Sequence, residues 1–156
     1  MPATNSGASQ SLVHSRAPVW RRSDGGPGTA GEAILVVDDD PMCSRVMASA
    51  LELDGHRVDW TTAPAHALEL VREKRYAVMV SDMNMPSMLG TALAAEVAKL
   101  CPGVRMILVS AFADAQVRAA AHALGATLLA KPFRVDVLTA AVREVLREPG
   151  ERRVAP

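Results

Sequence analysis

Beyond residue 32, short apolar segments alternate along the chain with longer segments in which apolar residues recur at a helical spacing. Five short segments, each too brief for a helix, have the character of strands buried in a parallel sheet. They are Ala33–Val37, Arg57–Trp60, Ala77–Val80, Val104–Val109 and Thr127–Ala130. Between them, apolar residues recur at the three- and four-residue spacing of amphipathic helices. Five strands that alternate with five helices predict an α/β fold, with a doubly wound parallel sheet covered on both faces.

Aspartate, proline and glycine residues set the expected helix boundaries. Asp40 suits the cap of the first helix, Pro41 suits its first position, and Gly55 ends it. Asp114 and Gly125 bound the fourth helix in the same way. The expected inward faces are Cys43, Val46, Met47, Ala50 and Leu51 in the first helix; Pro64, Ala67, Leu68 and Val71 in the second; Val117, Ala120, Ala121 and Leu124 in the fourth; and Val135, Leu138, Val142, Val145 and Leu146 in the fifth.

The first 31 residues differ in composition from the rest of the chain. They are rich in Ser, Gly, Ala and Pro and show no apolar periodicity, so residues 1–31 are expected to be disordered, as are residues 149–156. A single folded domain is therefore predicted over residues 32–148. The cluster Val19-Trp20-Arg21-Arg22 could dock on a partner or on this domain, although a solvated tail is the simpler interpretation.

Composition excludes several classes of protein. The 156 residues suffice for one domain with a core, and 17 basic residues balance 17 acidic ones, so direct nucleic-acid binding is not expected. No apolar segment is long enough to cross a bilayer, so no membrane association is expected. Cys43 and Cys101 form no CxxC pair and are expected to be buried apolar residues. We therefore expect a cytoplasmic protein.

The expected strands end in residues that can carry chemistry. Asp38 and Asp39 follow the first strand, Asp82 the third, Ser110 the fourth and Lys131 the fifth. In a doubly wound sheet these ends lie at one edge, near the crevice where ligands bind. Each close pair of carboxylates repels by roughly 4 kcal/mol at an effective dielectric near 20, which favours a bound cation, and oxygen ligands favour Mg²⁺. Such a set suits transfer of a phosphoryl group onto a carboxylate.

Four motifs resemble the receiver domain of bacterial two-component response regulators. They are Val36-Val37-Asp38-Asp39-Asp40-Pro41, Ser81-Asp82-Met83-Asn84-Met85-Pro86 with Gly90, Val109-Ser110-Ala111, and Lys131-Pro132-Phe133. The resemblance extends from about Glu32 to Arg147. It implies a flavodoxin-like sheet with strand order 2-1-3-4-5.

The resemblance also implies a role for each acidic residue. Asp82 would accept a phosphoryl group from a phosphohistidine. Asp39 and Asp82 would bind Mg²⁺ directly, together with the backbone carbonyl of Asn84, and Asp38 would bind it through water. The metal ligands would therefore be Asp38, Asp39, Asp82 and Asn84.

Lys131 and Ser110 complete the site that the resemblance implies. Lys131 would pair with the phosphoryl group, and the Lys131-Pro132 bond is usually cis in the family. Ser110 would be a switch hydroxyl that moves toward the new phosphate. Many receivers carry an aromatic residue three positions before the lysine, where this chain has Leu128. Phe112 is a candidate substitute, and simple packing of its ring is the alternative.

The implied partners are a sensor histidine kinase or a histidine phosphotransfer protein, and a downstream protein target. A homodimer could form through the fourth helix, fifth strand and fifth helix. The short C-terminal end favours a stand-alone receiver that is no enzyme beyond self-catalysed phosphoryl transfer and autodephosphorylation. Two alternatives stay open. One is a phosphohydrolase of the haloacid dehalogenase type, suggested by Asp38-x-Asp40 followed by Ser110 and Lys131, and the other is a docking module that works without phosphorylation.

Overall fold

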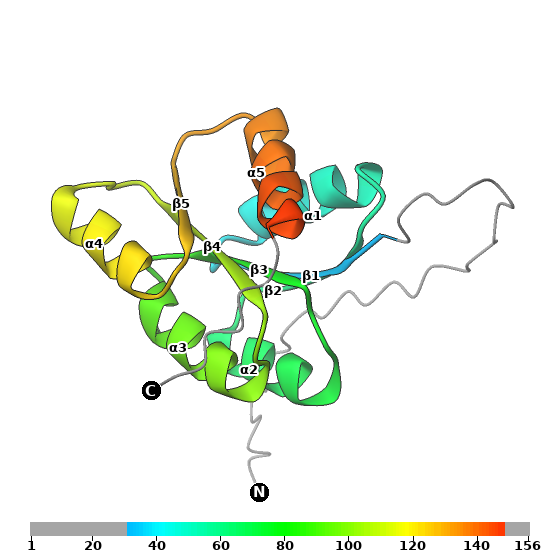
Figure 1. Cartoon of the computed structure of the whole chain (residues 1–156), viewed down its shortest axis with the longest axis horizontal. Helices are drawn as coiled ribbons and strands as arrows, with labels where there is room; N and C mark the ends of the chain where they lie inside the picture. The colour runs from blue at the N-terminus through cyan, green and yellow to red at the C-terminus, as the bar shows by residue number, and fades with distance from the viewer. Residues whose placement is uncertain (1–30, 149–156) are drawn as a thin grey trace, which may run out of the picture.

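A computed structural model describes residues 31–148 of the chain, in which five parallel strands form one sheet (Figure 1). Of the residues that were expected to be disordered, 1–30 and 149–156 lie outside the described residues, whereas Gly31 is described. The order β2-β1-β3-β4-β5 confirms the predicted flavodoxin-like fold class. The strands are β1 (Ala33–Val37), β2 (Arg57–Thr61), β3 (Val78–Asp82), β4 (Arg105–Ser110) and β5 (Thr127–Ala130). The helices are α1 (Pro41–Leu53), α2 (Pro64–Glu73), α3 (Gly90–Leu100), α4 (Ala115–Ala123) and α5 (Val135–Arg147).

The sheet separates two hydrophobic layers. On one face, Leu35 and Met79 pack in a cluster with residues of α2, α3 and α4. On the other face, Ile34 and Val78 pack in a cluster with residues of α1 and α5, and Figure 1 shows these two helices side by side. Successive residues of β1 therefore enter opposite layers, which explains why this strand is apolar throughout rather than alternating.

The predicted caps are found at the first and fourth helices. The Asp40 carboxylate accepts a hydrogen bond of 2.8 Å from the amide of Met42, and Asp114 accepts one of 2.9 Å from Val117. Gly55 and Gly125 follow these helices with φ of 95° and 65°. A positive φ is costly for any residue with a Cβ, and glycine, which has none, can adopt it at the end of both helices.

The predicted inward faces of α1 and α5 are partly wrong. Val46 is 52% exposed and Val135 is 49% exposed, although both were expected in the core. The buried stripe of α1 instead consists of Ser44, Met47, Ala48 and Leu51. Val46 of α1 and Val135 of α5 line a groove between the two helices. Each of these side chains therefore faces the neighbouring helix and not the sheet. In α2, Leu70 is buried and Leu68 is only half-buried.

Candidate functional site

Sheet register brings the expected strand ends to one edge. Val37 pairs with Ser81, Asp82 pairs with Val109, and Ser110 pairs with Ala130. Asp82 and Ser110 are the last residues of their strands, which end two positions and one position, respectively, beyond the predicted apolar segments. Asp38 and Lys131 directly follow β1 and β5.

Three carboxylates meet at this edge. Asp38, Asp39 and Asp82, here called the acidic trio, each offer an oxygen, and these oxygens lie within 4.8 Å of one another. Asp38 and Asp82 are buried, at 1% and 7% exposure, whereas Asp39 is exposed. A set of oxygen ligands that is buried on one side and open on the other fits a hard divalent cation that keeps part of its water shell. Asn84 lies two residues beyond Asp82, where it bridges to Leu89 and is exposed.

Lys131 contacts two of the three carboxylates of the acidic trio directly. Its Nζ lies 3.0 Å from Asp38 Oδ2 and 3.0 Å from Asp82 Oδ1. Burial lowers the pKa of Lys131, but the hydrogen bonds to Asp82 and Asp38 outweigh that effect and raise it to about 12. The ammonium group is therefore charged at neutral pH and offsets part of the repulsion between the two buried carboxylates. The Lys131-Pro132 bond is cis, as the family resemblance implied.

Ser44 supports the site and was missed by the sequence analysis. Its side chain is fully buried, and its hydroxyl donates a hydrogen bond of 2.8 Å to the carbonyl of Asp38. The Asp38 carboxylate in turn accepts one of 2.9 Å from the amide of Asp40. Ser44 lies three residues before Met47 on the buried stripe, so a polar residue at a core spacing was the available signal.

The Ser110 hydroxyl is engaged within its own loop. It donates a hydrogen bond of 2.9 Å to the carbonyl of Phe112 and accepts one of 3.1 Å from the Phe112 amide. The Ser110 residue is fully buried at the sheet edge, while Phe112 is 71% exposed. Leu128 is half-buried and packs against the cluster beneath α2, α3 and α4. The structure thus brings together the acidic trio and Lys131, with the hydroxyl of Ser110 turned to the backbone of its loop.

Asp40 does not belong to the trio. Its carboxylate is exposed and caps α1, where the Met42 amide and then the Cys43 thiol lower its pKa. A phosphohydrolase of the haloacid dehalogenase type would use Asp40 as its second acid beside Asp38. The orientation of Asp40 toward the helix end therefore counts against that alternative.

Comparison with known proteins gives the family. Residues 34–143 match the family model for the response regulator receiver domain. The chain belongs to this family. Receiver domains interact with kinases or phosphotransfer proteins and typically bind a divalent metal, and this chain has a cluster of acidic side chains in the acidic trio.

Individual relatives agree with the assignment. The probable transcriptional regulatory protein TcrX of Mycobacterium tuberculosis is 29% identical over 131 residues, which are 83% of this chain and 54% of TcrX. The chain thus spans about half the length of that relative. A CheY-like receiver domain protein from Methanospirillum hungatei has a TM-score of 0.72 and 27% identity, over 76% of this chain and 95% of that one.

A second similar structure carries ligands. It is a response regulator from Burkholderia pseudomallei with a phosphorylated aspartic acid, calcium ion and citrate, with a TM-score of 0.66 and 25% identity. The match covers 76% of this chain and 75% of that chain.

Among residues 31–148, none of the helices has the length and apolar character needed to cross a membrane.

Proposed function

We propose that this protein is a phosphoacceptor of a two-component phosphorelay. Asp82 would take a phosphoryl group from a phosphohistidine of a sensor histidine kinase or of a histidine phosphotransfer protein. The observation that carries the proposal is the place of Asp82, which is 7% exposed, belongs to the acidic trio and contacts Lys131 at 3.0 Å. The phosphorylated aspartic acid of the Burkholderia relative supports it.

The transfer forms one bond and breaks one. A carboxylate oxygen of Asp82 attacks phosphorus, the N–P bond of the phosphohistidine breaks, and its electron pair stays on the imidazole, which takes up a proton. The product is an acyl phosphate. Lys131 already donates to Asp82 Oδ1 and Asp38 Oδ2, so its ammonium group is within reach of the oxygens of an incoming phosphoryl group. It would stabilise the negative charge that these oxygens carry during the transfer.

The proposed cofactor is Mg²⁺. Asp39, Asp82 and the carbonyl of Asn84 would hold it directly, and Asp38 would hold it through water. A bound divalent ion supplies positive charge that neutralises phosphoryl oxygens. The oxygen-only composition of the trio supports this choice, and so does the calcium ion of the Burkholderia relative.

The output would be a binding event with a downstream protein, in the cytoplasm and without direct contact to nucleic acid. After phosphorylation, Ser110 would give up its hydrogen bonds with Phe112 and turn toward the phosphate, which would move the exposed Phe112 and its loop. The surface of α4, β5 and α5 would change with it and could form a homodimer. The protein would lose the phosphoryl group by self-catalysed hydrolysis.

Uptake of phosphorus from a small donor tests the proposal. The full chain is incubated with acetyl phosphate and Mg²⁺, and its intact mass is measured over time. We expect a gain of one phosphoryl group, which is lost on Asp82→Asn or when Mg²⁺ is removed, and which is strongly slowed by Lys131→Met. Asp114→Asn, the same chemical change at an exposed helix cap, should phosphorylate normally. Equal uptake by the wild type and Asp82→Asn would refute the proposal.

A further inference from the structure

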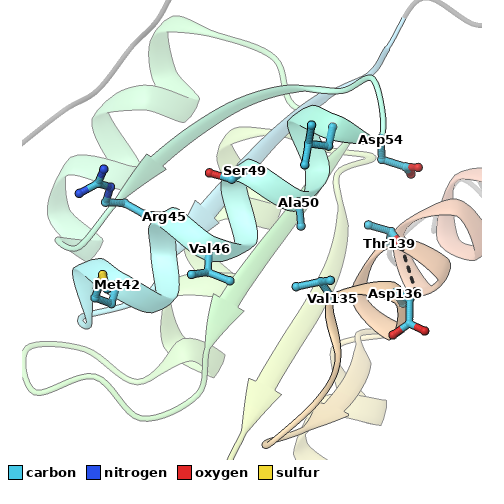
Figure 2. A pocket seen from close by; sticks show the side chains of 10 residues that line it. Met42, Arg45, Val46, Ser49, Ala50, Asp54, Val135, Asp136 and Thr139 are labelled. Atoms are coloured by element: carbon cyan, nitrogen blue, oxygen red, sulfur yellow. Dashed lines mark hydrogen bonds between the residues drawn. The ribbon is translucent and has the colours of Figure 1, made fainter.

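An apolar groove of about 740 Å³ lies between α1 and α5 (Figure 2). Three large apolar side chains of α1 line it, namely Met42, Val46 and Leu53, which are 67, 52 and 90% exposed. Val135 of α5 lies opposite them. Lone exposed apolar side chains are common on proteins, but several around one groove mark a surface that another segment covers.

The described part of the chain begins beside one end of this groove. Gly31 packs so closely on the turn after α1 that a Cβ there would clash with the carbonyl oxygen of Gly55. The Gly31 carbonyl also accepts a hydrogen bond of 3.3 Å from Arg57 Nε. Gly55 directly follows Asp54, which lines the groove. Residues 1–30 therefore join the domain beside the Leu53–Asp54 end of the groove.

The residues before Gly31 include a segment that fits this surface. Val19-Trp20-Arg21-Arg22 combines two apolar side chains with two positive charges. Trp20 precedes Gly31 by eleven residues, which span at most roughly 36–40 Å when extended. The 13 residues of α1 are only about 20 Å long, so Trp20 can reach any point of the groove. The glycines at positions 25, 26 and 28 lie between them and allow the chain to turn back.

The lining of the groove includes two carboxylates, Asp54 and Asp136, and one arginine, Arg45. The side chain of Asp136 is 64% exposed although it contacts Arg134. Asp54 lies at the other end, where both of its carboxylate oxygens already accept from Arg143. Asp136 is therefore the carboxylate of the lining that is more open to a further arginine.

We infer that Val19–Arg22 packs into the α1–α5 groove of the same molecule. Trp20 lies against Val46, Leu53 and Val135, and one of the two arginines pairs with Asp136. A segment tethered this closely has an effective concentration on the order of millimolar, so it occupies the groove ahead of a second copy at ordinary protein concentrations.

Fluorine NMR of the full chain tests the contact without using phosphorylation. The two tryptophans are labelled as 5-fluorotryptophan, and Trp20→Phe assigns their signals. Trp60 is 8% exposed in the core and is an internal standard for a buried ring. We expect the Trp20 signal to be shifted from that of a peptide of residues 15–26, and shielded from a soluble paramagnetic agent, independently of protein concentration.

Two substitutions at exposed positions distinguish the groove from other surfaces. Val46→Asp should return the Trp20 signal to the position and broadening of the free peptide. Ala119→Asp, at an exposed position of α4 outside the groove, should leave it unchanged. A Trp20 signal that matches the free peptide in the wild type would overturn the inference, as would shielding that survives Val46→Asp or appears only at high protein concentration. Uptake of phosphorus from acetyl phosphate would remain intact in each of these cases.

Discussion

Asp38 is the most constrained carboxylate of the acidic trio. Its side chain accepts hydrogen bonds from the Asp40 amide and from Lys131, and its carbonyl accepts one from Ser44. Its own amide donates to the carbonyl of Thr61 at 3.3 Å. These contacts hold the residue from β2, from α1 and from the end of β5 at once. The site is therefore preorganised by partners that lie outside the trio itself.

Ser44→Ala tests this support. The substitution leaves the buried carbonyl of Asp38 without its hydroxyl partner, which should lower the free energy of unfolding by about 1–3 kcal/mol. It should also slow phosphoryl uptake, because Asp38 is then held less firmly. Ser49→Ala, an exposed position on the same helix, should change stability by less than about 0.5 kcal/mol. Urea unfolding of both variants measures the difference, and equal midpoints would contradict the supporting role of Ser44.

At the scale of elements, the loop between β3 and α3 closes tightly on the end of β3. The amide of Gly90 donates a hydrogen bond of 2.8 Å to the carbonyl of Met83, and Asn84 bridges to Leu89. Met83 and Met85 are buried, so the loop has its own apolar anchors. The loop thereby fixes the residues that follow Asp82, including the carbonyl of Asn84 that the proposed metal would use.

Gly90→Ala should disturb this loop severely. A Cβ there would clash with the carbonyl of Asp82 and lie 2.9 Å from the Cα of Met83, and both are backbone atoms that cannot move alone. We expect a loss of more than about 2 kcal/mol of stability, together with slower phosphoryl uptake. Gly103→Ala is the control, because a Cβ there meets open space and costs only about 1–2 kcal/mol of strain at its φ of 91°. Equal losses in the two variants would contradict the close packing of Gly90.

Tyr76 links the edge strand β2 to the segment that enters β3. Its hydroxyl donates a hydrogen bond of 2.5 Å to Asp59, and its side chain is buried. Burial and then this hydrogen bond raise the pKa of Tyr76 well above its usual value of 10. Above pH 10 the unfolded chain therefore releases the phenolic proton while the folded chain keeps it, so stability should fall as the pH rises beyond 10.

Absorbance of the phenolate measures this shift directly, because Tyr76 is the only tyrosine in the sequence. In the wild type the phenolate should appear well above pH 10, whereas in urea it should appear near 10. Asp59→Ala should lower the pKa of Tyr76 in the folded protein. A native titration centred near 10 would show that neither burial nor the contact with Asp59 raises the pKa of Tyr76.

At the scale of the whole molecule, the sequence predicted which strand-end residues lie close together, but it did not predict the contacts that position each of them. Asp38, Asp39, Asp82 and Lys131 could be placed because the carboxyl ends of parallel strands share one edge. The outward position of Val46 and Val135 could not, because helical periodicity does not tell a stripe that faces the sheet from one that faces a neighbouring helix. The ion pair of Arg143 with Asp54, which joins α5 to the end of α1, depends on the same packing and left no signal in the sequence.

The central claim is that Asp82, among three adjacent carboxylates, carries the phosphoryl group. Borohydride reduction after incubation with acetyl phosphate and Mg²⁺ converts the phosphorylated aspartate to homoserine, and peptide mass spectrometry then locates it. We expect homoserine at position 82 alone, in amounts that depend on Mg²⁺. Homoserine at position 38 or 39, or at no position despite intact folding, would contradict it, and position 38 would favour the phosphohydrolase alternative.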